Sequence, residues 1–188
     1  MAVCATTVVG GLGLLILYAH PEALGRRSGG PLACQTDECG RSGTGVPVHI
    51  GGSASIGPIA LRNEGEATLT LERVELLDVD PGLEVIDVVL VEPNGRHPPV
   101  GARQGFPPPG VGQTHAVRGF ELAPAVSSSD FVQVLFGLRL RAAGRAGSRR
   151  IAVDYRVGRK PYRAYFDDAM WLCTWALSRR GECIDPDW

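Results

Sequence analysis

The sequence contains very little lysine, asparagine or methionine. Lys160 is the only lysine among 19 basic residues, asparagine occurs only at Asn63 and Asn94, and methionine only at Met1 and Met170. So few methionines exclude a methionine-rich copper site. We interpret the preference for arginine over lysine as the codon usage of a GC-rich, bacterial genome.

An excess of charge of one sign is also missing. The 19 basic and 20 acidic residues give a formal net charge of -1. Proteins dedicated to nucleic acid usually carry a large basic excess, so we expect no nucleic-acid partner. Apolar residues make up 44% of the chain, which is enough for a packed core and excludes wholesale disorder. The length of 188 residues indicates one domain, or one domain with short appendages.

Motifs for catalysis and cofactor binding are absent. The sequence has no Gly-x-Ser-x-Gly elbow, no Walker motif and no dinucleotide-binding glycine motif. Gly10, Gly11 and Gly13 are close together, but they lie within an apolar run. Asp167 and Asp168 are adjacent, so on a strand they would point to opposite faces and make a poor acid–base pair. We therefore predict that the chain is not an enzyme, with no catalytic residue and no cofactor.

Metal ligands are not clustered in the sequence. The four histidines, His20, His49, His97 and His115, have no ligand-like neighbours at short spacing. Cys34 and Cys39 lack the second nearby pair that a zinc site needs. We assign no metal ligand, and keep as an alternative an exported metal carrier in which His49, His97 and His115 converge.

Residues 3–19 form the longest apolar run, and the run contains no charge. As a helix, 17 residues span about 26 Å, the short end of what a bilayer requires. No basic residue precedes the run and no small-x-small cleavage site follows it, which disfavours a cleaved signal peptide. We predict an uncleaved, single-pass membrane anchor; a signal peptide and a buried core helix remain alternatives.

The orientation of this anchor is ambiguous. Arg26 and Arg27 follow the run, and the positive-inside rule alone would place the rest of the chain in the cytoplasm. The cysteines favour the opposite orientation, with the rest of the chain outside the cytoplasm. Cys34 with Cys39, and Cys173 with Cys183, form two local pairs typical of an oxidising compartment. We predict an extracytoplasmic C-terminal domain at the cell membrane, with Cys173–Cys183 as the main disulfide and Cys34–Cys39 as a second.

The composition divides the chain into four parts. After the anchor, residues 20–45 read as a Gly/Pro/Ser linker with the first cysteine pair. Residues 46–173 contain about seven short strand patterns, separated by turns, and a Pro/Gly-rich loop at 92–119. Within residues 67–77 the apolar alternation shifts by one at Glu72 and Arg73, which predicts either a β-bulge or a change of face there. Residues 174–188 form a tail with tryptophan and cysteine.

These patterns resemble those of bacterial exported immunoglobulin-like domains. Residues 59–65 read Ile-Ala-Leu-Arg-Asn-Glu-Gly and are followed by Leu69, Leu71 and Val74; residues 122–124 read Leu-Ala-Pro and precede a strand at 132–138. The resemblance covers residues 46–173 and implies an antiparallel, immunoglobulin-like β-sandwich. It implies no catalytic residue, and the insertion at 92–119 departs from compact members of the class.

The last residues admit two structures. Asp167 or Asp168 caps a helix over residues 169–180, or residues 170–173 form the final strand. Trp171, Trp175 and Trp188 all lie here, and they either close the core or form a patch for a partner or membrane surface.

Charge is distributed unevenly along the chain. Residues 62–92 hold nine acidic residues against two basic ones, and residues 139–163 hold nine basic residues against Asp154 alone. Strands on different sheets would create an acidic and a basic face, whereas neighbouring strands would pair the two sets. The candidate interaction surface comprises Arg139, Arg141, Arg149, Arg150, Arg156, Arg159, Arg163, Trp171 and Trp175.

Together these features predict a membrane-anchored, exported binding or scaffold module. Its partner would be a protein or an anionic surface polymer. An accessory subunit of a larger membrane complex is the alternative, in which the glycines of the anchor and the tryptophans contact a partner.

Overall fold

The computed structural model describes residues 27–34, 43–92 and 100–184. The expected anchor at 3–19 lies outside these residues, as do Cys39, His20, His97 and Trp188. Within the described part, no helix combines the length and the apolar character needed to cross a membrane.

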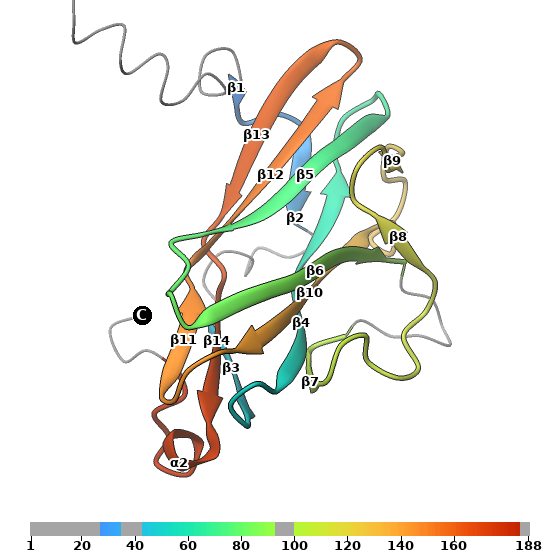
Figure 1. Cartoon of the computed structure of the whole chain (residues 1–188). Coiled ribbons are helices and arrows are strands. Elements are labelled where there is room, and N and C mark those ends of the chain that lie inside the picture. Colours follow the sequence, from blue (N-terminus) through green and yellow to red (C-terminus); the bar gives the residue numbers. More distant parts are fainter. Residues whose placement is uncertain (1–26, 35–42, 93–99, 185–188) are drawn as a thin grey trace, which may run out of the picture.

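The described chain is mainly β, as predicted, and most of its strand pairs are antiparallel (Figure 1). One sheet has the order β1 (Arg27–Ser28), β13 (Lys160–Phe166), β12 (Arg150–Val157), β5 (Leu69–Leu77) and β9 (Glu121–Leu122). A second has the order β2 (Leu32–Cys34), β4 (Ser53–Asn63), β10 (Val132–Leu140), β6 (Leu83–Val91) and β8 (Thr114–Ala116), with β7 (Ala102–Gln104) beside β4.

A third, smaller sheet closes one end of the molecule. It has the order β11 (Arg145–Ser148), β14 (Ala169–Thr174) and β3 (Gly43–Val48), and the helix α2 (Trp175–Ser178) follows β14. Strand β14 runs parallel to β3, as β1 does to β13. Figure 1 shows α2 at the opposite end of the molecule from β1.

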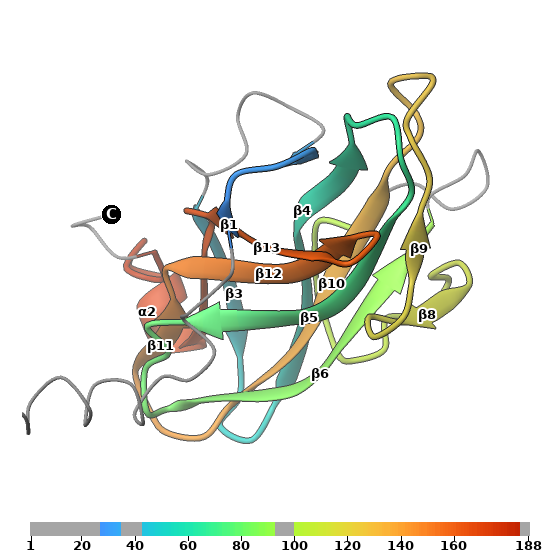
Figure 2. The ribbon, with the colours of Figure 1, turned by 90° about the horizontal axis from the view of Figure 1, so that it is seen from above.

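The main core draws side chains from both large sheets. Leu71 and Val153 come from the first sheet, and Ile59 and Phe136 from the second; all are buried in one cluster. Figure 2 shows β12 and β5 crossing over β10 and β4. The alternation of apolar residues in β12 and β5 places one face of each strand in this core and leaves the other face polar.

The register between β5 and β12 contains a bulge, which is one of the two alternatives expected at Glu72 and Arg73. Asp154 lies opposite Arg73 and Tyr155 lies opposite Leu71, so Glu72 has no partner of its own across the pair. An extra residue in one strand bends that strand and re-aims its side chains. The bulge lets both Glu72 and Arg73 lie on the outer, polar face.

The segment after residue 100 lies across the outer face of the second sheet. Val100, Leu135 and Val91 form a small separate apolar cluster, against which Phe106 packs. The Gln133 side chain joins the layers: its amide oxygen accepts from Val100 N–H at 2.7 Å, and its amide nitrogen donates to the carbonyls of Val100 and Gly57 at 2.7 and 2.9 Å. The part of the expected loop at 92–119 that contains Val100 and Phe106 therefore packs against the second sheet and is hydrogen-bonded to it.

Two glycines in strands lie directly beneath aromatic rings. A Cβ atom at Gly137 would meet the ring of Phe106, and one at Gly147 would meet the ring of Trp171. Any side chain at either position would displace the aromatic ring, because core packing leaves no spare volume.

Part of the expected linker at 20–45 belongs to the sheets. Residues 27–28 pair with β13, residues 32–34 pair with β4, and β3 begins at Gly43. The hydroxyl of buried Tyr155 donates to the carbonyl of Gly29 at 3.1 Å, which holds the segment between β1 and β2 against the core.

The C-terminal residues adopt the strand alternative. Residues 169–174 form β14, and the helix is limited to four residues, Trp175–Ser178. Apolar side chains from Ala169 to Cys173 are buried on both faces of this central strand, which overrides the possible cap at Asp167 or Asp168. The predicted disulfide between Cys173 and Cys183 is present. Cys34 is also disulfide-bonded, and its partner lies outside the described residues.

Candidate functional site

A groove of about 420 Å³ lies on the outer face of the first sheet, over the bulge in β5. It is lined by Thr70, Leu71, Glu72, Arg73, Arg118, Gly119 and Arg156. The lining brings together three guanidinium groups and one carboxylate. The bulge supplies two of these side chains, β12 supplies Arg156, and the loop between β8 and β9 supplies Arg118.

The backbone positions Arg118 beside the bulge. Leu71 N–H donates to the carbonyl of Phe120 at 2.9 Å, and Gly119 N–H donates to the carbonyl of Leu71 at 2.8 Å. Gly119 has a φ of +83°, a conformation that residues with a Cβ rarely adopt. This turn fixes the loop along the edge of β5, with Arg118 at the groove.

The three arginines differ in their partners. Arg156 lies 3.2 Å from Glu72, and Arg73 lies 3.1 Å from Asp154. Within the described ranges Arg118 has no ion-pair partner. A guanidinium presents a planar fork of donors that matches a carboxylate or a phosphate. The groove can therefore accept an anionic group between Arg118 and Arg156, with Glu72 as the internal counter-ion to be displaced.

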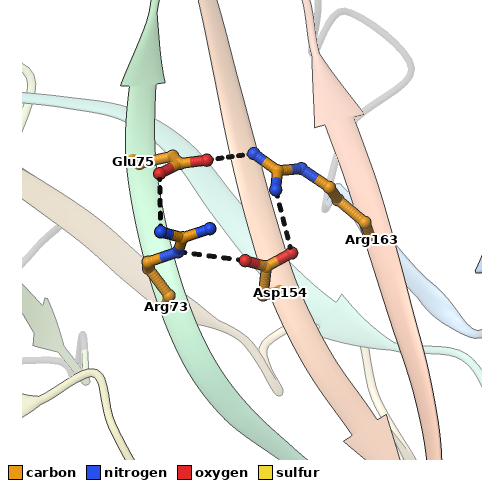
Figure 3. Close-up of polar contacts among 4 residues, drawn as sticks. All are labelled: Arg73, Glu75, Asp154 and Arg163. Atoms are coloured by element: carbon orange, nitrogen blue, oxygen red, sulfur yellow. Dashed lines mark hydrogen bonds and ion pairs between the residues drawn. The ribbon is translucent and has the colours of Figure 1, made fainter. Parts of the chain in front are cut away.

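A four-residue network holds Arg73 in place (Figure 3). Arg73 pairs with Asp154 and with Glu75, while Arg163 from β13 pairs with the same two carboxylates. The two positive and two negative charges cancel. The network therefore stiffens one wall of the groove without adding net charge to it.

The acidic and basic clusters of the sequence lie on neighbouring strands rather than on different sheets. Acidic β5 pairs with basic β12, and β6 pairs with β10. Glu84 of β6 contacts both Arg139 and Arg141 at 3.2 and 2.6 Å. The hydrogen bond from Arg141 lowers the pKa of Glu84 below its usual value, with a smaller lowering from Arg139. The condition for two oppositely charged faces is thus not met.

The remaining residues of the candidate interaction surface are dispersed. Arg150 pairs with Asp78 at 3.1 Å near the β5–β6 turn, and Arg149 precedes it on the exposed surface. Arg159 lies at the exposed tip of the β12–β13 hairpin. Trp171 is only 1% exposed and belongs to the core, whereas Trp175 is 38% exposed at the α2 end. Of the predicted set, only Arg156 lines the groove.

The histidines do not form a metal centre within the described ranges. No group of three or more histidine, cysteine, aspartate or glutamate side chains converges there. His49 lies near Trp175, with ring centroids 6.4 Å apart, and His115 lies near Phe120, with centroids 5.4 Å apart. The two histidines thus have different neighbours.

Sequence reasoning missed Arg118 and Thr70 as lining residues. The irregularity at Glu72 and Arg73 did indicate the bulge. Nothing in the local sequence connects Arg118 with β5. The contact depends on the turn at Gly119, which binds to Leu71, about fifty residues earlier in the chain. A glycine directly after an arginine, at 118–119, was the only local signal.

Comparison with known proteins finds no related family and only weak structural similarity. No protein-family model matches the chain, and no curated protein matches it. Among solved structures it is similar to the Vibrio cholerae VesB protease, with a TM-score of 0.35, 11% identity, and coverage of 73% of this chain and 32% of that one. It is also similar to the secreted serine protease VesC from Vibrio cholerae, with a TM-score of 0.32, 10% identity, and coverage of 69% and 21%.

These neighbours contradict the prediction that the chain is not an enzyme. Both solved structures are proteases, so the prediction is withdrawn. The chain spans less than a third of either protease, and TM-scores this low carry no argument for a protease fold or for hydrolytic activity in this chain.

Proposed function

We propose that the chain is a membrane-anchored, extracytoplasmic binding module with an immunoglobulin-like β-sandwich. Residues 3–19 serve as its anchor, and the groove over β5 binds the anionic group of a surface polymer. Two large sheets that share one core support the sandwich. A disulfide between Cys173 and Cys183 supports an oxidising compartment.

The observation that carries the binding proposal is the position of Arg118. Its guanidinium lines the groove together with Arg156 and Arg73, and it has no ion-pair partner in the described part of the chain. Most other arginines of the two sheets already contact a carboxylate. A cation without an internal counter-ion, next to a second cation, favours an external anion.

Binding can be tested with two simple polyanions, inorganic polyphosphate and poly-L-glutamate, added to the full-length chain in nanodiscs of neutral lipid. We expect Arg118→Ala to weaken binding at least fivefold. Glu72→Gln should strengthen it, because the internal competitor for Arg156 is removed. The matched control is Arg103→Ala, which removes an exposed arginine from β7, outside the groove.

Equal losses in Arg118→Ala and Arg103→Ala would overturn the groove as the binding site and leave only nonspecific charge attraction. Binding should weaken with added salt, because exposed charges are screened over a Debye length of about 8 Å at physiological ionic strength. A groove that is selective for one anionic group would bind polyphosphate and poly-L-glutamate with different affinities.

The location can be tested with an introduced cysteine. Val126 is 94% exposed, so Val126→Cys offers a reactive thiol on the surface, whereas Cys173 and Cys183 are already bonded. A membrane-impermeant maleimide should label this variant in intact cells. Labelling only after lysis would place the domain in the cytoplasm, as Arg26 and Arg27 alone suggest, and would overturn the proposed export.

A further inference from the structure

A second groove lies at the α2 end, away from the arginine groove. It has a volume of about 380 Å³ and is lined by Val48, His49, Ile50, Thr174, Trp175, Ala176 and Arg179. A smaller hollow of about 90 Å³ adjoins it, shares Val48 and His49, and adds Gly52, Ser53 and Gln104. The α2 groove, as we call the two together, is formed by the turn between β3 and β4 and by the start of α2.

Large apolar side chains are exposed along this groove. Trp175 is 38% exposed and Ile50 is 58% exposed. The imidazole of His49 lies at 48° to the indole of Trp175, with ring centroids 6.4 Å apart. An accessible indole beside a second ring offers a flat apolar surface with polar atoms at its edges.

Apart from Arg179, the polar side chains of the α2 groove are neutral, and the lining includes no acidic residue. Thr174 and Ser53 supply hydroxyls, and Gln104 an amide whose nitrogen donates to the carbonyl of Pro47 at 2.9 Å. Arg179 has no ion-pair partner among the described residues. Its neighbour Arg180 is bound at 2.9 Å by Glu182. The lining is therefore complementary to an anion.

Both walls of the groove are fixed before any ligand arrives. Gly51 N–H donates to the carbonyl of Leu140 at 2.7 Å, and Leu140 N–H donates to the carbonyl of Gly52 at 3.1 Å, which ties the β3–β4 turn to β10. The disulfide between Cys173 and Cys183 closes the loop that contains α2. A preformed site loses less conformational entropy on binding.

We propose that the α2 groove binds an acidic saccharide, that is, a pyranose ring that carries a carboxylate. The apolar face of the ring lies on the indole of Trp175, its hydroxyls bond to Thr174 and His49, and its carboxylate pairs with Arg179. A neutral sugar satisfies only the first two contacts. A shallow surface with an aromatic plate, several hydroxyl-bonding groups and one cation fits this chemistry better than a purely apolar partner does.

The test is isothermal titration calorimetry on the full-length chain in nanodiscs of neutral lipid, without detergents that carry sugar headgroups. The probes are trigalacturonic acid, which is acidic, and maltotriose, which is a neutral trisaccharide. We expect the acidic probe to bind at least tenfold more tightly than the neutral one.

Four variants assign the contacts. Trp175→Ala should lose at least tenfold in affinity for the acidic probe, and Trp175→Phe should retain most of it, because an aromatic plate remains. Arg179→Gln should reduce the affinity for the acidic probe to that for the neutral one. Arg180→Gln is the matched control, since Arg180 pairs with Glu182 and does not line the groove.

Absence of binding by either sugar, or binding that Trp175→Ala and Arg179→Gln leave unchanged, would overturn the proposal. A membrane surface as the true occupant would also overturn it, and would appear as quenching of Trp175 by brominated lipids, with no response to either sugar. These outcomes are independent of Arg118, so failure here leaves the proposed function of the arginine groove intact, and the reverse also holds.

Discussion

Asp154 lies directly opposite Arg73 on one side and Arg163 on the other, so that one carboxylate joins three adjacent strands. Its side chain is only 1% exposed, and its carboxylate pairs with Arg73 at 3.1 Å and with Arg163 at 3.6 Å. A buried charge is tolerated only when paired, and here two cations and the ladder of backbone hydrogen bonds surround it.

Replacement of this carboxylate should destabilise the domain. In Asp154→Asn both arginines lose a charged partner, and we expect a loss of about 2 kcal/mol in the free energy of unfolding, below the range for a fully buried pair because Arg73 reaches solvent. Urea denaturation measures this loss. Glu182→Gln, at the exposed pair with Arg180, is the control and should cost under about 0.5 kcal/mol. Equal effects would show that burial of Asp154 is not decisive.

Gln133 should matter more than an ordinary polar residue on a strand. Gln133→Ala leaves the N–H and carbonyl of Val100 without their amide partner, and the expected loss is about 2–3 kcal/mol in the free energy of unfolding. Trypsin should also cleave faster at Arg103, because the segment over the second sheet is released. Gln113→Ala, which removes an exposed amide away from this cleavage site, provides the comparison; similar cleavage in both variants would refute this role.

Loss of the C-terminal disulfide should be measurable both locally and globally. The bond closes a loop with a sequence separation of 10, for which the chain-entropy relation gives about 3 kcal/mol. A Cys173→Ser, Cys183→Ser double variant should show this loss in urea denaturation. Hydrogen exchange should rise most in α2, which lies within the closed loop. Uniform exchange throughout the domain would contradict the local part of this prediction.

The alkaline stability of the domain should depend on Tyr155. Burial raises the pKa of this phenol above its ordinary value of 10.0. The folded state therefore keeps the proton that the unfolded state releases first, and the contribution of Tyr155 is complete below about pH 10 and is lost as the pH rises through the folded pKa.

Tyr155→Phe removes that titration together with the hydrogen bond to the carbonyl of Gly29. We expect a loss of about 1 kcal/mol at neutral pH, and a shallower decline in stability above pH 10 than in the unaltered chain. Thermal denaturation at a series of pH values between neutral and alkaline measures both. If the stability of the two proteins declines equally steeply above pH 10, groups other than Tyr155 control the alkaline stability.

Much of the sheet structure could be predicted from alternation. The strand expected at 132–138 lies within β10, and the shift of the apolar alternation at Glu72 and Arg73 matches the bulge in β5. These features depend on local periodicity, which the sequence records directly.

Other features depend on contacts between distant segments. Gln133 is a polar residue in a strand, yet it is buried because the segment that begins at Val100 covers that face of the sheet. Residues 27–34 read as linker because each of their strands is too short for a periodic signal. The groove over β5 could not be predicted from the sequence either, because it depends on contacts between distant segments. Arg118 and Arg156 approach each other only when both the β8–β9 loop and β12 lie beside β5.

Gly137 beneath Phe106, and Gly147 beneath Trp171, have a consequence for how this sequence can drift over evolutionary time. Neither glycine can gain a side chain while its ring remains, and loss of the ring alone would open a void above the glycine. Gly137 and Phe106 therefore form one heritable unit, which passes to descendants whole or is replaced in two coordinated substitutions. Gly147 is constrained further, because a side chain there would also meet the backbone carbonyl of Met170, and so it stays glycine even if the ring of Trp171 is lost.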